Sequence, residues 1–573
     1  MRVTAQAGGV SVRAIAGSSC VLLAMDAADA ARQGLLGFAF RVENPATGEG
    51  RWLRGFKFFE DLVPNPQSGE RRSTLEHPIQ SFLWGHYSAT PDTDYSYTVR
   101  PMYGTPGNLT AGTDVTVEVH TEPNDRGTHA IFFNRGAIPS QKFADLFGNR
   151  GPVDQNDPDA DDVKWLSRGL LEATLEFIGQ ARGPQYELRA AVYEFSYPPV
   201  LDAFARAAAS GSQVKVIYEA GKRKDAGVLK DTSTTVGNRK AIRDAGLPGM
   251  ANLKLIKRKK RRAIPHNKFI ILLENGHPVQ VWTGSTNFTP SGFLGQSNVG
   301  HIVRDDTVAS SYLTYWNKLS GDPEPDPFQD WCSAHSPYPG DGLPPVGITP
   351  IFSPRARSKM LTWYGDRLEA ASQTVMLTAA FGVTRKLAER FDNDRDFLRF
   401  LLMERKNRSA ETQAMLESDI DTRIALGAAL NRDAIEFEMD GHSLDEWFRK
   451  EQHYRRRGHI FYVHTKIMLI DVMTNDPLVF TGSANFSTAS LLSNDENMLL
   501  IRGDLAVADI YVTEFTRLFN HFYFRYIAQK LAKEGSADPT KAAFLKTTDA
   551  WVRRNFRSGS YHCRRRLLFG TPP

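Results

Sequence analysis

One block of polar residues occurs twice in this chain, and no other feature restricts the possible folds as strongly. The first copy begins at His266 and the second at His464. In each copy a Lys follows two residues after the His, and a Thr-Gly-Ser-x-Asn-Phe segment follows at one common distance. The shared positions are His266, Lys268, Gly284, Ser285, Asn287 and Phe288 in the first copy, and His464, Lys466, Gly482, Ser483, Asn485 and Phe486 in the second. Packing alone rarely preserves such a polar set twice, so we expect two related halves.

Each copy predicts a buried hairpin with a reactive end. Residues two apart in a strand project to one face, so the His and Lys of each H-x-K point into a common space. The apolar runs at 269–273 and 467–470 predict strand interiors, and turn residues follow each run. The second strand of each hairpin ends at Gly284 or Gly482, which presents the Ser and Asn at the strand end.

The gathered side chains suit a phosphodiester substrate. A Lys ammonium is a point charge for a phosphate oxygen, and Ser and Asn can donate hydrogen bonds to the remaining oxygens. Two copies place two imidazoles beside one phosphorus atom. One neutral His can attack phosphorus, while the other protonates the leaving oxygen and then deprotonates the water that resolves the phosphohistidine. This chemistry requires no metal and no cofactor, and we expect none.

These residues resemble the H-x-K-x4-D and G-S-x-N motifs of the phospholipase D superfamily, which occur twice per active site. The second copy matches fully, with Asp471 at the acidic position. The first copy has Leu273 at that position and Glu274 one place later. Because this Asp looks mainly structural in the family, the departure casts little doubt on catalysis.

The resemblance also implies a Glu, shortly after the motif, that orients a catalytic His. Glu496 fits this position in the second copy, whereas the first copy has Asn298. A carboxylate partner makes an imidazole more basic, which favours His464 as the imidazole held by an acid. Which His acts as the nucleophile stays open at this point.

The resemblance implies an α/β fold with two fused α-β-α-β-α sandwich halves related by a pseudo-twofold. We expect the first half at residues 126–340 and the second, with a basic C-terminal tail, at residues 341–573. Residues 1–125 alternate apolar and polar positions between short turns, which predicts an antiparallel β-sandwich of the fibronectin III or immunoglobulin-like kind. A Pro- and Gly-rich stretch at 322–345 predicts an extended surface linker between the halves.

Basic runs lie close to both copies of the motif. One run, at 254–262, leads into His266, and another, at 455–457, precedes His464. The tail from Trp551 interleaves arginines with aromatic residues, a pattern that suits a polyanion. We assign Lys260, Arg262, Arg456 and Arg457 to substrate binding. The net charge of +5 is modest, so the protein as a whole is no strong polyanion binder.

The sequence favours a metal-independent nuclease, because both copies end in the T-G-S-x-N-F-[ST] form of the nuclease-type members. One alternative is a phospholipase D acting on phosphatidylcholine-type lipids, and another is a non-catalytic polyanion-binding module. The predicted catalytic residues are His266, His464, Lys268, Lys466, Asn287 and Asn485, with Glu496 orienting a His and Ser285 and Ser483 assisting. The substrate is then nucleic acid or an anionic or zwitterionic phospholipid.

The active site is expected to be complete within one chain, so a homodimer is not required. The three cysteines are scattered and form no disulfide or zinc pattern. No signal peptide and no apolar run of about 20 residues is visible in the sequence. We therefore expect a soluble, cytoplasmic protein.

Overall fold

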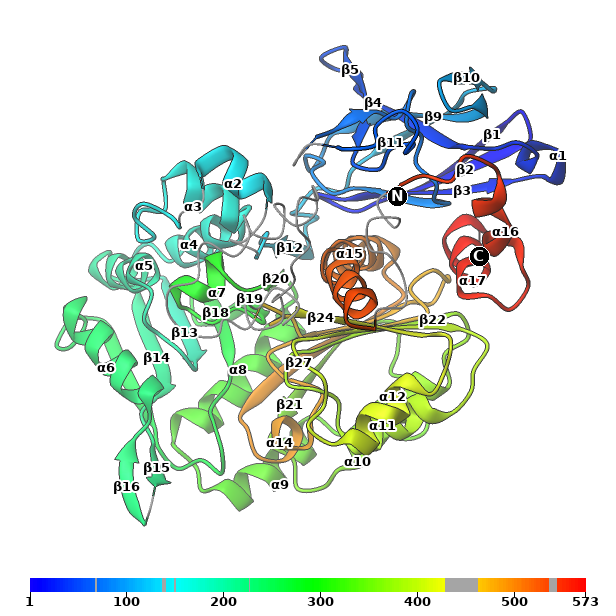
Figure 1. The fold of residues 1–573 in the computed structure, drawn as a ribbon. Helices are drawn as coiled ribbons and strands as arrows, with labels where there is room; N and C mark the ends of the chain where they lie inside the picture. Colours follow the sequence, from blue (N-terminus) through cyan, green and yellow to red (C-terminus); the bar gives the residue numbers. More distant parts are fainter. Residues whose placement is uncertain are drawn as a thin grey trace.

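The computed structural model describes residues 1–66, 70–136, 141–148, 151–225, 227–427, 462–534 and 544–572. Three regions built on β-sheets follow one another along this part of the chain (Figure 1). The first comprises two antiparallel sheets near the N-terminus, and the other two are seven-stranded mixed sheets.

The N-terminal region forms one sheet in the order β1-β2-β3-β8 and another in the order β10-β9-β4-β5, with β11 also paired to β9. Every pairing is antiparallel, as the alternating sequence predicts. Alternate residues such as Val12, Phe40 and Val99 point into one apolar core. The strands are β1 (Arg2–Ala7), β2 (Val10–Ala16), β3 (Val21–Ala27), β4 (Gly37–Asn44), β5 (Glu49–Trp52), β8 (Leu83–His86), β9 (Asp94–Thr105), β10 (Asn108–Ala111) and β11 (Val115–His120).

The two seven-stranded sheets have the same strand order, so the duplicated motif reflects a duplicated fold. The first has the order β12-β20-β19-β18-β13-β14-β17 and the second the order β21-β27-β26-β25-β22-β23-β24. The first contains β12 (His129–Phe133), β13 (Tyr186–Val192), β14 (Gln213–Glu219), β17 (Leu253–Arg258), β18 (Lys268–Glu274), β19 (His277–Gly284) and β20 (Val299–Val303). The second contains β21 (Gly347–Ser353), β22 (Thr374–Ala379), β23 (Leu398–Met403), β24 (Thr422–Leu426), β25 (Ile467–Ile470), β26 (Leu478–Gly482) and β27 (Glu496–Arg502).

Helices cover both faces of each seven-stranded sheet. The first sheet buries Phe269 and Ile271 on its inner face and Ile270 and Leu272 on its outer face. Burial on both faces explains why the motif strands are continuous apolar runs. Two helices, α8 (Asp306–Ser320) and α15 (Leu505–Glu534), contribute to the core that the two sheets share.

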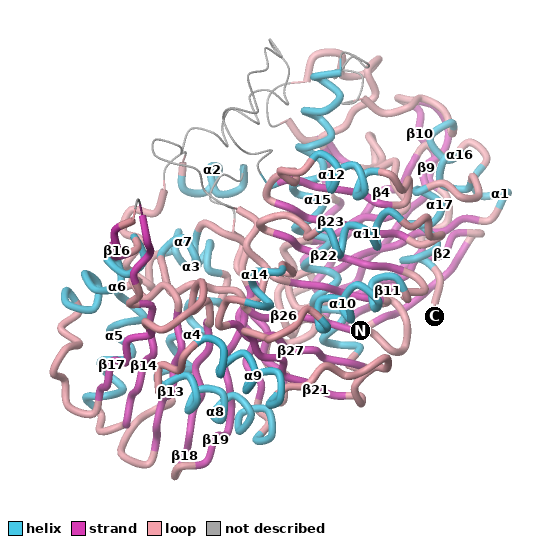
Figure 2. The backbone as a smooth tube through the Cα atoms, turned by 90° about the horizontal axis from the view of Figure 1, so that it is seen from below, coloured by secondary structure: helices cyan, strands magenta, loops and turns pink. Residues whose placement is uncertain are grey.

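The outer layers complete the predicted α-β-α-β-α arrangement, which Figures 1 and 2 show from two directions. The first sheet is covered by α4 (Leu170–Gly179), α5 (Pro198–Ala209) and α6 (Ser233–Asp244), and the second by α10 (Lys359–Glu369), α11 (Arg385–Asp392) and α12 (Ala410–Glu417). Shorter elements are α1 (Asp29–Arg32), β6 (Arg54–Gly55), β7 (Arg72–Ser73), α2 (Gln141–Phe147), α3 (Asp161–Ser167), β15 (Lys222–Asp225), β16 (Val228–Asp231), α7 (Pro290–Leu294) and α14 (Thr488–Leu492).

A buried ion-pair cluster joins the central helix α15 to the first half. Glu514 accepts hydrogen bonds from Arg168 at 2.6 Å and from Arg517 at 2.7 Å. Burial opposes ionisation of Glu514, but the two guanidinium groups outweigh it and hold the pKa of this carboxyl at about 2. The cluster therefore remains ionised at neutral pH.

The stretch between the halves contains a helix, so the prediction of an extended linker at 322–345 is wrong for its central part. Helix α9 spans Pro325–His335. Proline is tolerated in the first turn of a helix, where its missing N–H has no partner to lose. Phe328 and Cys332 are fully buried, and the Phe328 ring stacks on Tyr315 of α8. Apolar contact thus holds the segment against the core.

The C-terminal tail forms two packed helices that leave Arg553, Arg554 and Arg557 exposed, and its contact with a polyanion stays a prediction. Helices α16 (Ala550–Phe556) and α17 (Tyr561–Gly570) lie beside the N-terminal sheets (Figure 1). Trp551 stacks on Phe82 and donates its indole N–H to the carbonyl of Leu35 at 2.9 Å. Arg566 forms an ion pair with Asp26. The alternating aromatic residues therefore reflect burial against these sheets.

No helix in the described ranges combines the length and the apolar composition needed to cross a bilayer.

Candidate active site

The His and Lys of both copies are buried where strands β18 and β25 begin. His266 lies two residues before β18 and His464 three residues before β25, and each is about 5% exposed or less. Lys268 donates to the carbonyl of His266 at 2.7 Å, and Lys466 donates to that of His464 at 2.5 Å. The H-x-K spacing thus brings each ammonium group back beside its own His, as the strand periodicity predicts.

Each imidazole is held by a residue from the opposite half. His266 Nδ1 lies 2.9 Å from Glu496 Oε2, and His464 Nδ1 lies 2.8 Å from Asn298 Oδ1. The expectation that the acid holds His464 is therefore wrong, because Glu496 orients His266.

Backbone hydrogen bonds between the halves explain why each His is held by a residue of the other half. The amide of Asp495 donates to the carbonyl of Ile264 at 3.0 Å, and the amide of Ser297 donates to that of Tyr462 at 2.7 Å. The segment before His266 thus lies beside the start of β27, and the segment before His464 lies beside the start of β20. Glu496 and Asn298 each come one residue after these contacts, so each side chain reaches across the pseudo-twofold.

The electrostatics show that the four basic groups share one site. Burial and the neighbouring Lys268 lower the pKa of His266 to about 4, against the opposing effect of Glu496. Burial lowers the pKa of Lys268 to about 7. Burial, both lysines and His266 lower the pKa of His464. An anionic ligand would offset this concentration of positive charge.

The glycines before the two serines are required by close backbone approach. Gly284 and Gly482 have φ angles of 138° and 158°. An added Cβ would come within 2.2 Å of the Val299 carbonyl oxygen in the first half and within 2.4 Å of the Asn497 carbonyl oxygen in the second. Only glycine therefore allows β19 and β26 to end against their neighbours.

The two serine hydroxyls are anchored to the following strands. Ser285 donates to Asn298 Oδ1 at 2.8 Å and accepts from the amide of Val299 at 3.1 Å. Ser483 accepts from the amide of Asn497 at 3.0 Å. Ser285 thus positions Asn298, which in turn contacts His464. Direct contact of either serine with substrate stays a prediction.

Asn287 contacts a carboxylate that sequence reasoning missed. Its amide donates to Glu194 Oε2 at 2.5 Å. Glu194 follows β13, and Val192 of that strand pairs with Lys268. A charged residue just beyond an otherwise apolar strand was the available signal, but strand pairing was needed to place it.

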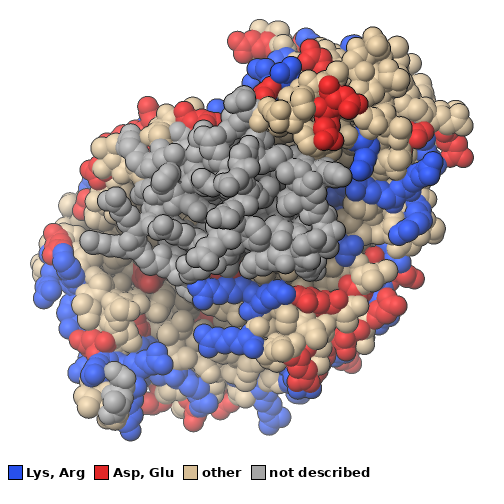
Figure 3. Space-filling model, viewed as in Figure 1, with Lys and Arg blue, Asp and Glu red and all other residues tan. Residues whose placement is uncertain are grey.

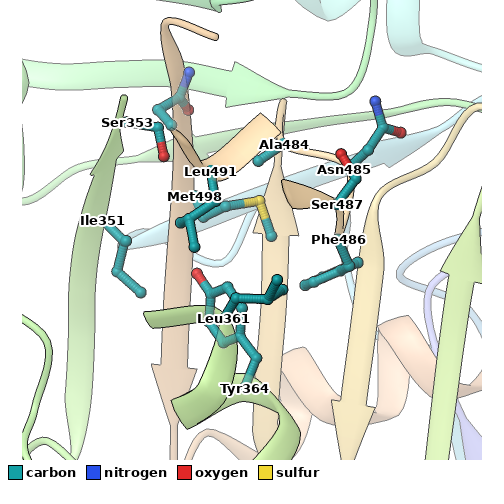
Figure 4. Close-up of a pocket in the computed structure, with 11 residues that line it drawn as sticks. Ile351, Ser353, Leu361, Tyr364, Ala484, Asn485, Phe486, Ser487, Leu491 and Met498 are labelled. Atoms are coloured by element: carbon teal, nitrogen blue, oxygen red, sulfur yellow. The ribbon is translucent and has the colours of Figure 1, made fainter. Parts of the chain in front are cut away.

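Asn485 occupies the corresponding position in the second half. Figure 4 shows its amide pointing away from the apolar side chains, including Leu361, Tyr364 and Phe486, that line a small pocket behind it.

The family's Asp has a structural position in the second half. Asp471 accepts hydrogen bonds from the amides of Ser372, Gln373 and Thr374 at 2.7–3.1 Å. Leu273 in the first half is buried in the shared core. Neither residue contacts the imidazoles through a hydrogen bond in the described chain, which agrees with a supporting role.

The predicted basic residues have different outcomes. Lys260 pairs with Glu324 at 2.8 Å, and Arg262 pairs with Asp326, so both charges are partly balanced at the start of α9. Their part in substrate binding stays a prediction. Arg456 and Arg457 lie outside the described residues.

Comparison with known proteins identifies the duplicated region. The family model described as "Cardiolipin synthase, PLD-like domain" matches residues 175–320 and again 390–519. Each match contains one copy of the motif. No curated protein matches the chain.

The chain also matches solved structures at low sequence identity. Polyphosphate kinase from Porphyromonas gingivalis is 13% identical, with a TM-score of 0.36, and the match covers 58% of this chain and only 43% of the kinase. Phosphatidylserine synthase from Haemophilus influenzae is 12% identical, with a TM-score of 0.40 and coverage of 66% and 94%. The phospholipase D family member Nuc from Salmonella typhimurium is 23% identical, with a TM-score of 0.20 and coverage of 26% and 86%.

Two matches to one family model, two sheets of one topology and two complete H-x-K and G-S-x-N sets lead to one conclusion. The chain belongs to the phospholipase D superfamily.

Proposed function

We propose that this protein cleaves phosphodiester bonds through a phosphohistidine formed on His266, with His464 as the general acid and base. The observation that carries the proposal is the unequal pairing of the two imidazoles. Glu496 contacts His266, and the neutral Asn298 contacts His464. The superfamily acts on phosphodiester bonds in general, and the unequal pairing supports different roles for the two histidines.

His266 is suited to nucleophilic attack. With its Nδ1–H donated to Glu496, its Nε2 carries the free lone pair. A bond from Nε2 to phosphorus leaves the ring positively charged, and the adjacent carboxylate stabilises that charge. Burial opposes ionisation of Glu496, but His266 holds the pKa of this carboxyl below its usual range.

His464 is suited to proton transfer. A protonated His464 gives its Nε2 proton to the leaving oxygen as the bond between phosphorus and that oxygen breaks. The neutral ring then takes a proton from water, which attacks phosphorus and releases His266. Lys268, Lys466, Asn287 and Asn485 would bind the non-bridging oxygens during both steps.

For the substrate, we propose nucleic acid first. Both copies end in T-G-S-x-N-F followed by Thr or Ser. The hairpin formed by β15 and β16 adds the exposed cations Lys222, Arg223 and Lys224, and basic side chains gather around it at the lower left of Figure 3. The hairpin adjoins the site, because the hydroxyl of Thr234, just beyond it, donates to Tyr193, whose ring lies 5.2 Å from that of His266. Cations there would attract a phosphate backbone.

A phospholipid is the second candidate, and a specific feature favours it. Val228 and Leu229 on the same hairpin are 57% and 64% exposed. Apolar side chains flanked by cations suit the surface of an anionic membrane. The matching family model is also named after a cardiolipin synthase.

The test of the mechanism is a trapped intermediate. Bis(p-nitrophenyl) phosphate has a leaving group that needs little protonation, so His464→Ala should still form the phosphoenzyme and then stall. We expect a burst of one p-nitrophenol per chain and a mass increase located on His266. His266→Ala should give neither. A burst from His266→Ala, or an adduct on His464, would reverse the assignment.

The test of the substrate uses single- and double-stranded DNA, RNA and phosphatidylcholine vesicles, each in excess chelator, with His464→Ala as the control. Cleavage of nucleic acid alone supports the nuclease. Head-group release alone selects the phospholipase. The third outcome is salt-sensitive binding of a nucleic acid or of the vesicles without turnover, equal in the wild type and in His464→Ala. That outcome would make the protein a polyanion-binding module.

A further inference from the structure

A carboxylate lies inside the predicted phosphate site of the first half, and the equivalent strand position of the second half, which lies within the described residues, holds no carboxylate. Glu194 is partly buried and accepts the amide hydrogen bond of Asn287. In the second sheet, Leu377 pairs with Met468. The same register, counted two residues further, puts Ala379 level with Lys466. Ala379 thus corresponds to Val192, which pairs with Lys268 in the first sheet. Two residues further, where the first half has Glu194, the second has Phe381.

Backbone contacts fix Glu194 in this position. Its carbonyl accepts from the amide of Phe288 at 3.2 Å, and the carbonyl of Phe288 accepts from the amide of Ser196 at 2.9 Å. The amide of Tyr193 is held by the carbonyl of Asn267 at 3.0 Å. The strand end that carries Glu194 is thus clamped between the segments that carry Lys268 and Asn287.

The surroundings favour a functional role over simple packing. A carboxylate next to two buried lysines interacts with both of them. Burial raises the pKa of Glu194, while Lys268, the Asn287 amide and Lys466 oppose that rise. Asn287 Oδ1, in turn, is buried and makes no hydrogen bond within the described residues. The Asn287 amide donates one of its two N–H groups to Glu194, which leaves the second N–H for a phosphate oxygen.

We propose that Glu194 is a specificity-determining residue that admits the singly charged phosphate of a diester and excludes the doubly charged phosphate of a monoester. The inference rests on the proposed function, in which Asn287 holds a phosphate oxygen. A diester gives its one negative charge to the two lysines. The additional charge of a monoester meets the negative charge of Glu194 across the Asn287 amide.

The size of the effect follows from this bridge. The carboxylate lies 2.5 Å from the amide nitrogen, and a phosphate oxygen bound to the other N–H of that amide would lie about 2.9 Å from the same nitrogen. The two N–H bonds diverge by about 120°, so the two oxygens would be about 5 Å apart. At an effective dielectric constant of about 20, repulsion over that distance weakens affinity by roughly 300-fold as an upper bound, so we expect at least a tenfold effect of removing the charge.

The experiment compares the binding of two ligands that differ by one charge. Dissociation constants for p-nitrophenyl phosphate and bis(p-nitrophenyl) phosphate are measured at pH 8 in the His266→Ala background, where the proposed nucleophile is absent. Glu194→Gln keeps the shape and removes the charge, and Glu194→Asp restores the charge. Glu274→Gln, at the exposed far end of β18, is the matched control.

We expect Glu194→Gln to bind the monoester at least tenfold more tightly and the diester within threefold of the parent. The monoester loses its second proton at a pH of about 6, so in the parent the ratio of monoester to diester affinity should fall between pH 5 and pH 8. Loss of charge from Lys268, whose pKa is about 7, weakens the binding of both ligands, and the ratio removes this shared effect. The fall in the ratio should disappear in Glu194→Gln and return in Glu194→Asp. Equal changes for both ligands, or no change for either, would overturn the proposal.

The readout separates this inference from the proposed function. Binding does not require turnover, so a charge-selective site could exist in a protein without phosphodiesterase activity. Conversely, an active enzyme in which Glu194→Gln leaves the monoester-to-diester affinity ratio unchanged would contradict only the role of Glu194.

Discussion

Replacing Glu496 with Gln tests the cross-half pairing directly. The substitution keeps the size of the side chain and an acceptor oxygen for the Asn494 amide, which contacts Glu496 at 2.9 Å. It removes the negative charge 2.9 Å from His266 Nδ1. Hydrogen bonds to charged groups contribute about 1.5–3 kcal/mol, and each 1.4 kcal/mol is a factor of about ten. We therefore expect phosphoenzyme formation to slow by about 10- to 150-fold.

The assay is the pre-steady-state burst with bis(p-nitrophenyl) phosphate, which separates formation of the phosphoenzyme from its hydrolysis. The rate of the burst should fall, while the unfolding temperature stays close to that of the wild type. Asn298→Ala, in the opposite half, should instead slow the later hydrolysis step that depends on His464. If Glu496→Gln leaves the burst rate unchanged and slows only turnover, His266 is not the nucleophile.

Three further substitutions test the structural framework. Glu514→Gln leaves buried arginines without their partner and should lower the free energy of unfolding by about 3–5 kcal/mol in urea titrations. Because the folded pKa of Glu514 is depressed to about 2, its contribution is present above the ordinary value of about 4.3 and is lost as the pH falls toward 2. The variant should therefore show a flatter acid dependence there, and an unchanged one would refute the pairing. Asp471→Asn should cost about 1–3 kcal/mol without changing turnover per folded molecule; a loss of turnover at full stability would make Asp471 functional. Trp551→Ala should cost about 3–5 kcal/mol, and the exposed Leu567→Ala almost nothing; equal effects would contradict the packing of α16.

Local sequence pattern predicts much of this fold. The apolar run that begins at Phe269 and its counterpart at 467–470 are strands in the structure, and each His and Lys is placed as their periodicity requires. The antiparallel N-terminal sheets also follow from alternation. These features depend on interactions within a few residues or on faces that bury a whole row of side chains.

Features set by contacts between distant segments were missed. Nothing near Glu496 reveals that it reaches His266, because the pairing depends on how two sheets of one topology pack together. The role of Trp551 depends on an N-terminal surface that the tail sequence does not describe. Glu194 looked like an ordinary strand-end residue until pairing placed it beside Asn287.

The packing of α16 and α17 on the N-terminal sheets has a consequence for biosynthesis. The ribosome makes Leu35 and Phe82 before both seven-stranded sheets, whereas Trp551, which covers them, follows both sheets in the sequence. During translation, this apolar surface must therefore wait until both copies of the motif have been made. Chaperones that bind exposed apolar segments would find the nascent N-terminal sheets accessible until α16 has emerged.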